Sequence, residues 1–243
     1  MDHAKIARQR TVGADLAQFE SLAPVDAEEP QLTAVGIFGA EHHPAMFSIR
    51  IHGRGGQGVV TAAELLSVAA FAEGQHAQAF PSFGPERSGA PVAAFCRIDD
   101  RPIRSHEPIA RPDAVVVVDA GVIHVVDVLQ GLGPRGFLLI NSVRRPEELA
   151  TGGPLSRLAD LVIVTVPATE IARRHLGRPL PNIPMLGALA GLTGWLKLAS
   201  IVDATRRRFP GMVGDANAAA ATEAFDLIRG RPVASPEAEA LPC

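Results

Sequence analysis

Short apolar runs alternate along the chain with segments that carry apolar residues at helical spacing, from Met46 to Gly230. In the run Ala114–Ala120, four consecutive valines predict a strand that is buried on both faces, as in a parallel sheet. Other apolar runs predict further strands of the same sheet: Met46–His52, Gln75–Phe80, Val92–Ile98, Gly136–Ser142 and Leu161–Pro167.

The segments between and after these runs predict helices, because their apolar residues recur at the spacing of a helix face. The predicted helices are Val59–Gly74, Gly121–Leu132, Ala168–Leu176, Met185–Leu198, Ser200–Phe209 and Ala216–Gly230. Each buried strand needs cover on both faces. The alternation therefore predicts an α/β fold with three layers, a Rossmann-like and mostly parallel sheet with helices on both faces.

The two ends of the chain lack this pattern. Residues 1–45 are mixed in character and contain prolines, so we expect an N-terminal extension that is a docking arm or partly disordered. Residues 46–230 form the regular domain, and residues 231–243 a loose tail. The first 20 residues lack the apolar core of a secretory signal, and the longest mostly apolar stretch, Ile183–Leu196, is too short to cross a bilayer. We expect no membrane association.

Composition narrows the function further. The 243 residues carry a formal net charge of -3, so no basic surface for nucleic acid is expected. The two cysteines, Cys96 and Cys243, belong to no C-x-x-C pair. A disulfide framework, a zinc site or an iron–sulfur cluster held by this chain alone is therefore not expected, and the sparse cysteine usage suits a reducing cytoplasm. The adjacent His42 and His43 have no matching metal ligands nearby in the sequence.

The segment Ser48–Val60, SIRIHGRGGQGVV, carries a glycine-rich pattern that is weak evidence on its own. Gly53, Gly55 and Gly58 have the spacing G-x-G-x-x-G, and Gly56 adds a further glycine. Glycine permits positive φ and close backbone approach to a ligand, and the N–H groups at the start of the next helix attract phosphate. Arg54 and Gln57 are expected to add hydrogen-bond donors.

The spacing by itself leaves three interpretations open: a turn whose glycines serve packing, a site for a phosphate or diphosphate group, and a site for NAD or FAD. A dinucleotide site also needs an acidic residue about 20 residues further on, and the second predicted strand ends without one. A P-loop is excluded, because no Gly-Lys-Ser/Thr closes the motif.

A second loop, Phe80–Val92, combines prolines and glycines with polar side chains. Arg87 can clamp an anion and Glu86 can orient it, while Ser82 and Ser88 add hydroxyl groups. In an α/β sheet both loops can meet at the carboxyl ends of strands, where such folds bind ligands. The alternative is a rigid turn with one ion pair.

For single residues elsewhere, we expect a structural role before a functional one. Asn182 is expected to cap the helix that follows it, and Asp119 to cap the turn after its strand or to face a ligand. His52 is expected to be structural, with acid–base work as the alternative. Trp195 and Cys96 are expected in the core. The run Arg206–Arg208 is expected on a solvated helix face.

Four ordered segments together resemble one family. They are GRGGQGVVTAAELL, AQAFPSFGPERSGAPVAAFCRI, PDAVVVVD and PNIPMLGALAGLTG. They resemble the gamma subunit of the 2-oxoacid:ferredoxin oxidoreductases, over the span from about Phe47 to Phe225. The segment FPSFGPERSGAPV is more similar to the branches that use pyruvate, branched-chain or aryl-glyoxylate substrates than to the 2-oxoglutarate branch.

The resemblance implies a reaction carried out by a complex of subunits. A 2-oxoacid, pyruvate first among the candidates, adds to thiamine diphosphate and loses CO2. Electrons pass through [4Fe-4S] clusters to ferredoxin, and coenzyme A takes the acyl group. Alpha, beta and delta subunits are implied as partners that hold thiamine diphosphate, Mg²⁺ and the clusters. The chain lacks both the cluster cysteines and a G-D-G…N motif. It is therefore expected to be an auxiliary subunit, inactive alone and without catalytic residues, that helps to shape the coenzyme A side.

The two loops are the candidate ligand-binding site. We expect Gly53, Arg54, Gly55, Gly56, Gln57 and Gly58, with Ser82, Glu86, Arg87 and Ser88, to contact coenzyme A or thiamine diphosphate. The weaker alternative is that the loops only form a subunit interface. Two other functions stay open: a stand-alone NAD(P)-dependent dehydrogenase and an interaction subunit that binds no ligand.

Overall fold

The computed structural model describes residues 46–82, 89–105, 107–150 and 161–230. The chain divides into two compact units, Met1–Gln31 and Leu32–Cys243, and everything described below belongs to the second. The extension with His42 and His43, the tail 231–243 and the loop residues Glu86, Arg87 and Ser88 lie outside the described residues. Expectations for these segments therefore stay predictions.

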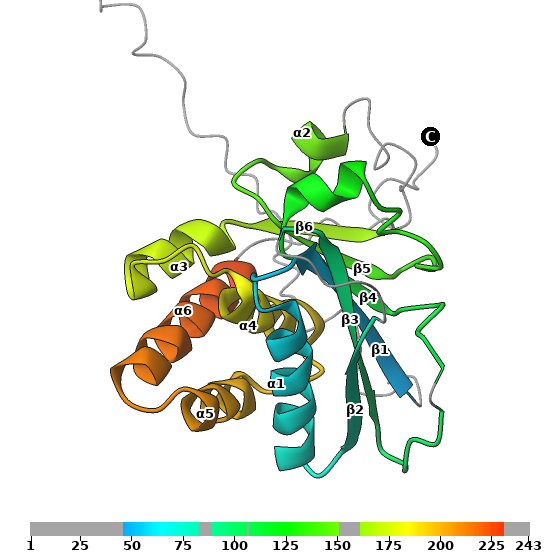
Figure 1. Cartoon of the computed structure of the whole chain (residues 1–243), viewed down its shortest axis with the longest axis horizontal. Helices are drawn as coiled ribbons and strands as arrows, with labels where there is room; N and C mark the ends of the chain where they lie inside the picture. The colour runs from blue at the N-terminus through cyan, green and yellow to red at the C-terminus, as the bar shows by residue number, and fades with distance from the viewer. Residues whose placement is uncertain (1–45, 83–88, 106, 151–160, 231–243) are drawn as a thin grey trace, which may run out of the picture. The chain divides into compact units, whose positions relative to one another are not determined.

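The centre of the domain is a six-stranded sheet (Figure 1). Its strands are β1 (Met46–Arg54), β2 (His76–Pro81), β3 (Pro91–Asp99), β4 (Ala114–Val117), β5 (Phe137–Asn141) and β6 (Val162–Val166), in the order β2-β3-β1-β4-β5-β6. Strand β3 is antiparallel to both neighbours, and the pairs β1–β4, β4–β5 and β5–β6 are parallel. The predicted α/β fold with a mostly parallel sheet is confirmed.

One face of the sheet is covered by long helices, which lie together on the left in Figure 1. They are α1 (Val59–Ala72), α3 (Ala168–Leu176), α4 (Asn182–Thr193), α5 (Leu198–Arg208) and α6 (Met212–Arg229). Phe47, Ile49 and Ile51 of β1 point into this main core. Every residue of α4 is buried, as expected for a helix that is apolar all round. The predicted helix Met185–Leu198 is wrong beyond Thr193, because Gly194 ends α4 with a φ of 65°.

The other face has lighter cover than predicted. The expected helix Gly121–Leu132 is wrong. The chain forms only a short 3-10 helix, η3 (Ala120–His124), followed by turns, while α2 (Pro146–Ala150) is the other short helix of this region. β-Branched residues crowd a helix, and in this segment Val122, Ile123 and Val128 instead bury themselves against Val115 and Val117.

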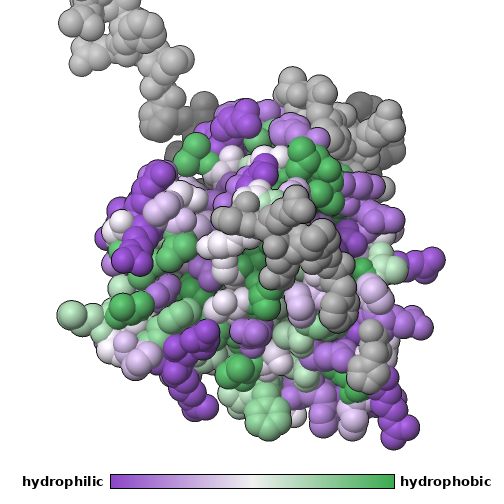
Figure 2. Space-filling model, in the orientation of Figure 1, coloured by the Kyte–Doolittle hydropathy of each residue, from purple (hydrophilic) through white to green (hydrophobic). Residues whose placement is uncertain are grey.

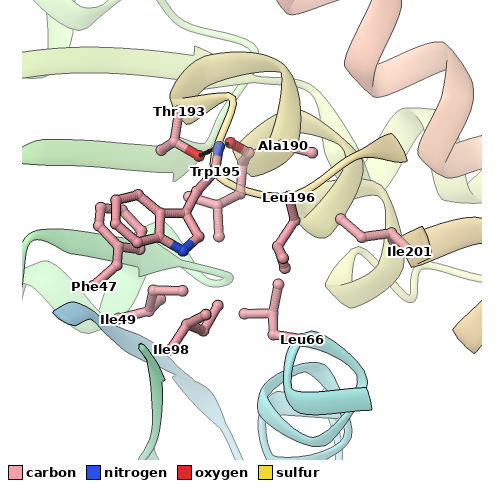
Figure 3. A pocket seen from close by; sticks show the side chains of 10 residues that line it. Phe47, Ile49, Leu66, Ile98, Ala190, Thr193, Trp195, Leu196 and Ile201 are labelled. Atoms are coloured by element: carbon pink, nitrogen blue, oxygen red, sulfur yellow. Dashed lines mark hydrogen bonds between the residues drawn. The ribbon is translucent and has the colours of Figure 1, made fainter. Parts of the chain in front are cut away.

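Trp195 lies where the main core closes over the start of β1 (Figure 3). Its indole stacks on Phe47 with ring centroids 4.5 Å apart and 14° between the planes. The cavity beside it measures only about 10 Å³, and its lining includes Ile49, Leu66 and Ile98. A space of that size holds at most one water. Trp195 is partly buried and packs against the main core, so the prediction of a core position holds only in part.

The outer surface carries no extended apolar region in the view of Figure 2, where hydrophilic and hydrophobic residues intermingle. The exposed large hydrophobic residues of the described chain are spread over five places: Val68 and Phe71 on α1, Val125 after η3, Val143 after β5, Leu180 before α4, and Met212 and Val213 at the start of α6. Arg206–Arg208 are exposed at the end of α5, as predicted. Among the described residues, no helix combines the length and apolarity that crossing a membrane requires.

Candidate functional site

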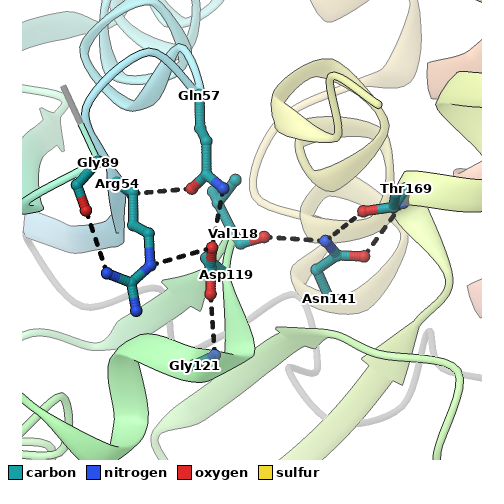
Figure 4. Close-up of polar contacts among 8 residues, drawn as sticks. All are labelled: Arg54, Gln57, Gly89, Val118, Asp119, Gly121, Asn141 and Thr169. Atoms are coloured by element: carbon teal, nitrogen blue, oxygen red, sulfur yellow. Dashed lines mark hydrogen bonds and ion pairs between the residues drawn. The ribbon is translucent and has the colours of Figure 1, made fainter. Parts of the chain in front are cut away.

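The carboxyl ends of β1, β4, β5 and β6 meet at one edge of the sheet, which is where open α/β folds place their ligands. Four side chains with polar groups gather there (Figure 4). Arg54 ends β1, Asp119 follows β4, Asn141 ends β5, and Thr169 is the second residue of α3, which follows β6. The glycine loop, Gly53–Gly58, crosses this edge between β1 and α1.

The glycine loop is a tight strand-to-helix turn, as the sequence predicted. Gly56 and Gly58 have φ angles of 92° and 71°, which side-chain-bearing residues rarely adopt. At Gly53 there is no room for a side chain, because a Cβ would lie 2.6 Å from Val59 Cγ2. The Gly55 N–H donates to the Ala90 carbonyl (2.9 Å), which ties the loop to the start of β3.

Asp119 organises the polar side chains of this loop (Figure 4). Its Oδ2 accepts a hydrogen bond from Gln57 Nε2 (2.9 Å) and lies 3.3 Å from Arg54 Nε. Its Oδ1 accepts from the Gly121 N–H (2.9 Å), so the predicted capping role is confirmed. Gln57 Oε1 in turn accepts from the Arg54 N–H (2.8 Å). Of the two residues predicted as donors to a ligand, Gln57 therefore donates to Asp119, and Arg54 forms an ion pair with it.

Asn182 was expected to cap α4, and that prediction is wrong. The residue is the first of the helix, and no side chain caps its N-terminus. Asn182 Nδ2 instead donates to the Gly58 carbonyl (3.3 Å) from a buried position. The start of α4 thus supports the start of α1 at the glycine loop.

Asn141 and Thr169 form a second polar cluster that the sequence reasoning missed. Asn141 Nδ2 donates to the Val118 carbonyl and to Thr169 Oγ1, both at 2.8 Å. Its Oδ1 accepts from the Thr169 N–H (3.1 Å), so Asn141 caps α3 from a neighbouring strand. An Asn at the end of an apolar strand was the available signal.

The second predicted loop is described only in part. Ser82 is exposed, and its N–H donates to the Ala93 carbonyl (2.8 Å), which extends the β2–β3 ladder. Gly89 lies beside the glycine loop, because its carbonyl accepts from Arg54 Nη1 (3.1 Å). The C-terminal end of the second loop, at Gly89, therefore lies at the candidate site.

His52 and Arg50 lie on the other face of β1 and are buried. Arg50 Nη2 donates to the carbonyls of Val128 (3.0 Å) and Gln130 (2.6 Å), which holds the turn after η3 against the sheet. Burial, aided by the Arg50 charge, lowers the pKa of His52 to about 4. A histidine that is neutral and enclosed at pH 7 is a poor acid, so the structural interpretation is favoured.

Acid should destabilise the protein through His52. Its pKa is about 4 when folded and about 6.5 when unfolded, so the unfolded chain binds the extra proton between these values. Stability attributable to His52 falls as the pH drops from 6.5 to 4, by up to about 3 kcal/mol. In His52→Leu, the difference in unfolding free energy between pH 7 and pH 4 should shrink by about that amount. Urea unfolding followed by Trp195 fluorescence measures it.

His124→Gln is the matched control for this experiment, because His124 is exposed. That variant should keep the pH dependence of the unmodified chain. Equal pH dependence in His52→Leu and the unmodified chain would contradict the assignment of the acid sensitivity to His52.

The chemistry that the described residues offer by themselves is limited. No group of three His, Cys, Asp or Glu side chains suited to a metal ion occurs in the described ranges. Burial raises the pKa of the Cys96 thiol to about 12, so it stays protonated, consistent with the inert buried thiol predicted. The described residues at this edge of the sheet are a glycine loop and the polar network around Asp119.

An α/β domain of this kind matches a known family. The family model for pyruvate ferredoxin/flavodoxin oxidoreductase matches residues 48–227, and the chain belongs to that family. Within it, the chain corresponds to the gamma subunit. It is 48% identical over 184 residues to the pyruvate synthase subunit PorC of Methanothermobacter marburgensis, covering 76% of this chain and 98% of the relative. It is 48% identical over 183 residues to the pyruvate/ketoisovalerate oxidoreductases common subunit gamma of Thermococcus kodakarensis, covering 74% and 96%.

Solved structures share the fold. The pyruvate oxidoreductase subunit PORC of Thermotoga maritima superimposes with a TM-score of 0.66 at 38% identity, over 75% of this chain and 96% of that one. A 2-oxoglutarate:ferredoxin oxidoreductase from Magnetococcus marinus gives a TM-score of 0.64 at 16% identity, over 80% of this chain and 33% of that one. The second likeness shows the fold alone.

Proposed function

We propose that the chain is the gamma subunit of a thiamine diphosphate-dependent pyruvate:ferredoxin oxidoreductase. Pyruvate and coenzyme A become acetyl-CoA and CO2, and two electrons pass to ferredoxin. The observation that carries this proposal is the 48% identity to pyruvate synthase subunit PorC over 98% of that relative's length. Agreement over nearly the whole relative supports the same place in a similar assembly.

The work is divided among subunits. Alpha, beta and delta chains hold thiamine diphosphate, Mg²⁺ and the [4Fe-4S] clusters in the cytoplasm. This chain supplies a preformed binding edge and no redox centre, so it is inactive alone. The buried, protonated Cys96 and the network around Asp119 support a scaffolding role over a redox role.

The glycine loop, with Ser82, Glu86, Arg87 and Ser88, binds phosphate groups of coenzyme A or thiamine diphosphate. One observation supports an anionic ligand at this loop. The first turn of α1 has no acidic residue and no side-chain cap, so its N–H groups are suited to a phosphate group. If the loops only form a subunit interface, substitutions in them will weaken assembly without changing the KM for coenzyme A.

A free-standing NAD(P) dehydrogenase fits the geometry less well. In a dinucleotide fold, the acid that binds the ribose ends a strand next to β1. Here the neighbour of β1 on that side is β3, which is antiparallel, while β2 ends at Pro81 without an acid. NAD(P) binding by the isolated chain would favour this alternative.

Purification of the native complex tests the proposed function. The chain should co-purify with larger subunits that contain thiamine diphosphate and iron–sulfur clusters. That complex should reduce ferredoxin with pyruvate only when coenzyme A is present, and a panel of 2-oxoacids will rank the substrates. Turnover by the isolated chain, or a complex without coenzyme A-dependent oxidation of any 2-oxoacid, would contradict the proposal.

A further inference from the structure

Asp119 is placed to control the one cation contributed by the described part of the glycine loop. Arg54 supplies that positive charge, and its Nε lies 3.3 Å from Asp119 Oδ2 (Figure 4). The two side chains are 34% and 24% exposed, so the pair is open to solvent and to a ligand. An ion pair of this exposure contributes little to stability. Stability therefore does not explain why a negatively charged residue stands at position 119.

The capping contact of Asp119 does not require a charge. Its Oδ1 accepts from the Gly121 N–H (2.9 Å), and an asparagine caps a turn as well as an aspartate does. Gln57 is already oriented by its bond from the Arg54 N–H (2.8 Å). Compared with an asparagine, a carboxylate supplies a second acceptor oxygen, which takes the Gln57 Nε2 bond (2.9 Å), and a negative charge next to Arg54 at the edge where the anionic ligand is expected.

We propose that Asp119 is the resident counter-ion of Arg54, which a phosphate group of coenzyme A displaces on binding. This inference rests on the proposed function and narrows the ligand of the loop to an exchanging co-substrate. A carboxylate beside the loop competes with the phosphate for Arg54, so it weakens binding of the anion. Weak, reversible binding suits coenzyme A, which enters free and leaves acylated in every turnover.

The test uses the assembled complex with pyruvate saturating and coenzyme A varied. In Asp119→Asn, the KM for coenzyme A should fall about 3- to 10-fold, because the competing charge is gone. The value of kcat and the KM for pyruvate should stay within about twofold, whereas a merely structural role would lower kcat. Asp215→Asn is the matched control: it also breaks an Asp–Arg pair, with Arg206 (2.9 Å) on the exposed α5–α6 surface, and should leave all constants unchanged.

The variant Arg54→Gln distinguishes failure of the proposed function from failure of the inference about Asp119. It should raise the KM for coenzyme A about 10-fold or more, through loss of the charge that meets the phosphate. If the unmodified complex shows no coenzyme A-dependent oxidation, the proposed function fails and the inference with it. If Arg54→Gln leaves the KM for coenzyme A unchanged, the loop does not bind coenzyme A and the inference is overturned. If Arg54→Gln acts but Asp119→Asn leaves or raises that KM, the counter-ion role alone is overturned.

Discussion

Replacing Gly187 with alanine should destabilise the domain by about 3 kcal/mol or more, the largest effect of the substitutions considered, because the new methyl group overpacks two buried helices. Gly187 lies in α4, and a Cβ there would be 2.0 Å from the carbonyl oxygen of Ala221 in α6. That oxygen is backbone, so the two helices must separate or rotate. The free energy of urea unfolding, followed by Trp195 fluorescence, measures the cost.

Gly191 provides the graded control on the same helix. A Cβ at Gly191 would lie 3.0 Å from the Phe225 carbonyl oxygen and 3.3 Å from Ile228 Cβ, so small shifts relieve the contact. Gly191→Ala should cost about 1 kcal/mol or less, partly offset by the better helix propensity of alanine. Equal stability of the two variants would show that α4 and α6 do not require a glycine at their closest approach.

The helix layer also positions the site. Asn182 at the start of α4 donates to the Gly58 carbonyl, where α1 begins. A shift of α4 away from α6 therefore moves the support of the glycine loop. Gly187→Ala is thus expected to change ligand binding as well as stability, although Gly187 lies in the helix layer and not in the loop.

Local patterns predicted the parts of the fold that local chemistry determines. The valine run Val115–Val118 predicted a buried strand, and β4 is fully buried. The helix predicted at Gly121–Leu132 failed, because its apolar residues serve the second face of the sheet from turns. Helical spacing and irregular burial produce similar patterns over so short a segment. Gly194 is a typical helix end, but the predicted helix Met185–Leu198 continued past it because apolar residues lie on both sides.

At the candidate site, too, local sequence patterns predicted some features and missed others. The turn at Gly53–Gly58 was readable, because glycine spacing reports backbone conformation directly. The partners of its side chains were not, since Asp119 lies 62 positions from Gln57 and Asn182 lies 124 positions from Gly58. Such contacts depend on which strand ends meet at the edge of the sheet. Topology decides that, and the order of apolar runs does not reveal it.

Gly58 joins the fold to the site, and Gly58→Ala should cost about 2–3 kcal/mol of stability through backbone strain and overpacking together. Its φ is 71°, and a Cβ would lie 2.4 Å from Asn182 Nδ2, a buried side chain. Gly56→Ala separates the two causes. Gly56 has a φ of 92° but open space around it, so its variant should lose only about 1 kcal/mol, from strain alone.

The double variant Gly58→Ala/Asn182→Ser then identifies the clash. Shortening Asn182 removes the side chain that the new methyl group would meet, so part of the lost stability should return despite the lost hydrogen bond to the Gly58 carbonyl. Urea unfolding of the unmodified protein, the two single variants and the double variant gives the coupling free energy between positions 58 and 182. If Gly58→Ala costs no more than Gly56→Ala, the loop does not need close contact with α4. The link from the helix layer to the binding edge would then have to run through Val59 and the rest of α1, which packs against the same core.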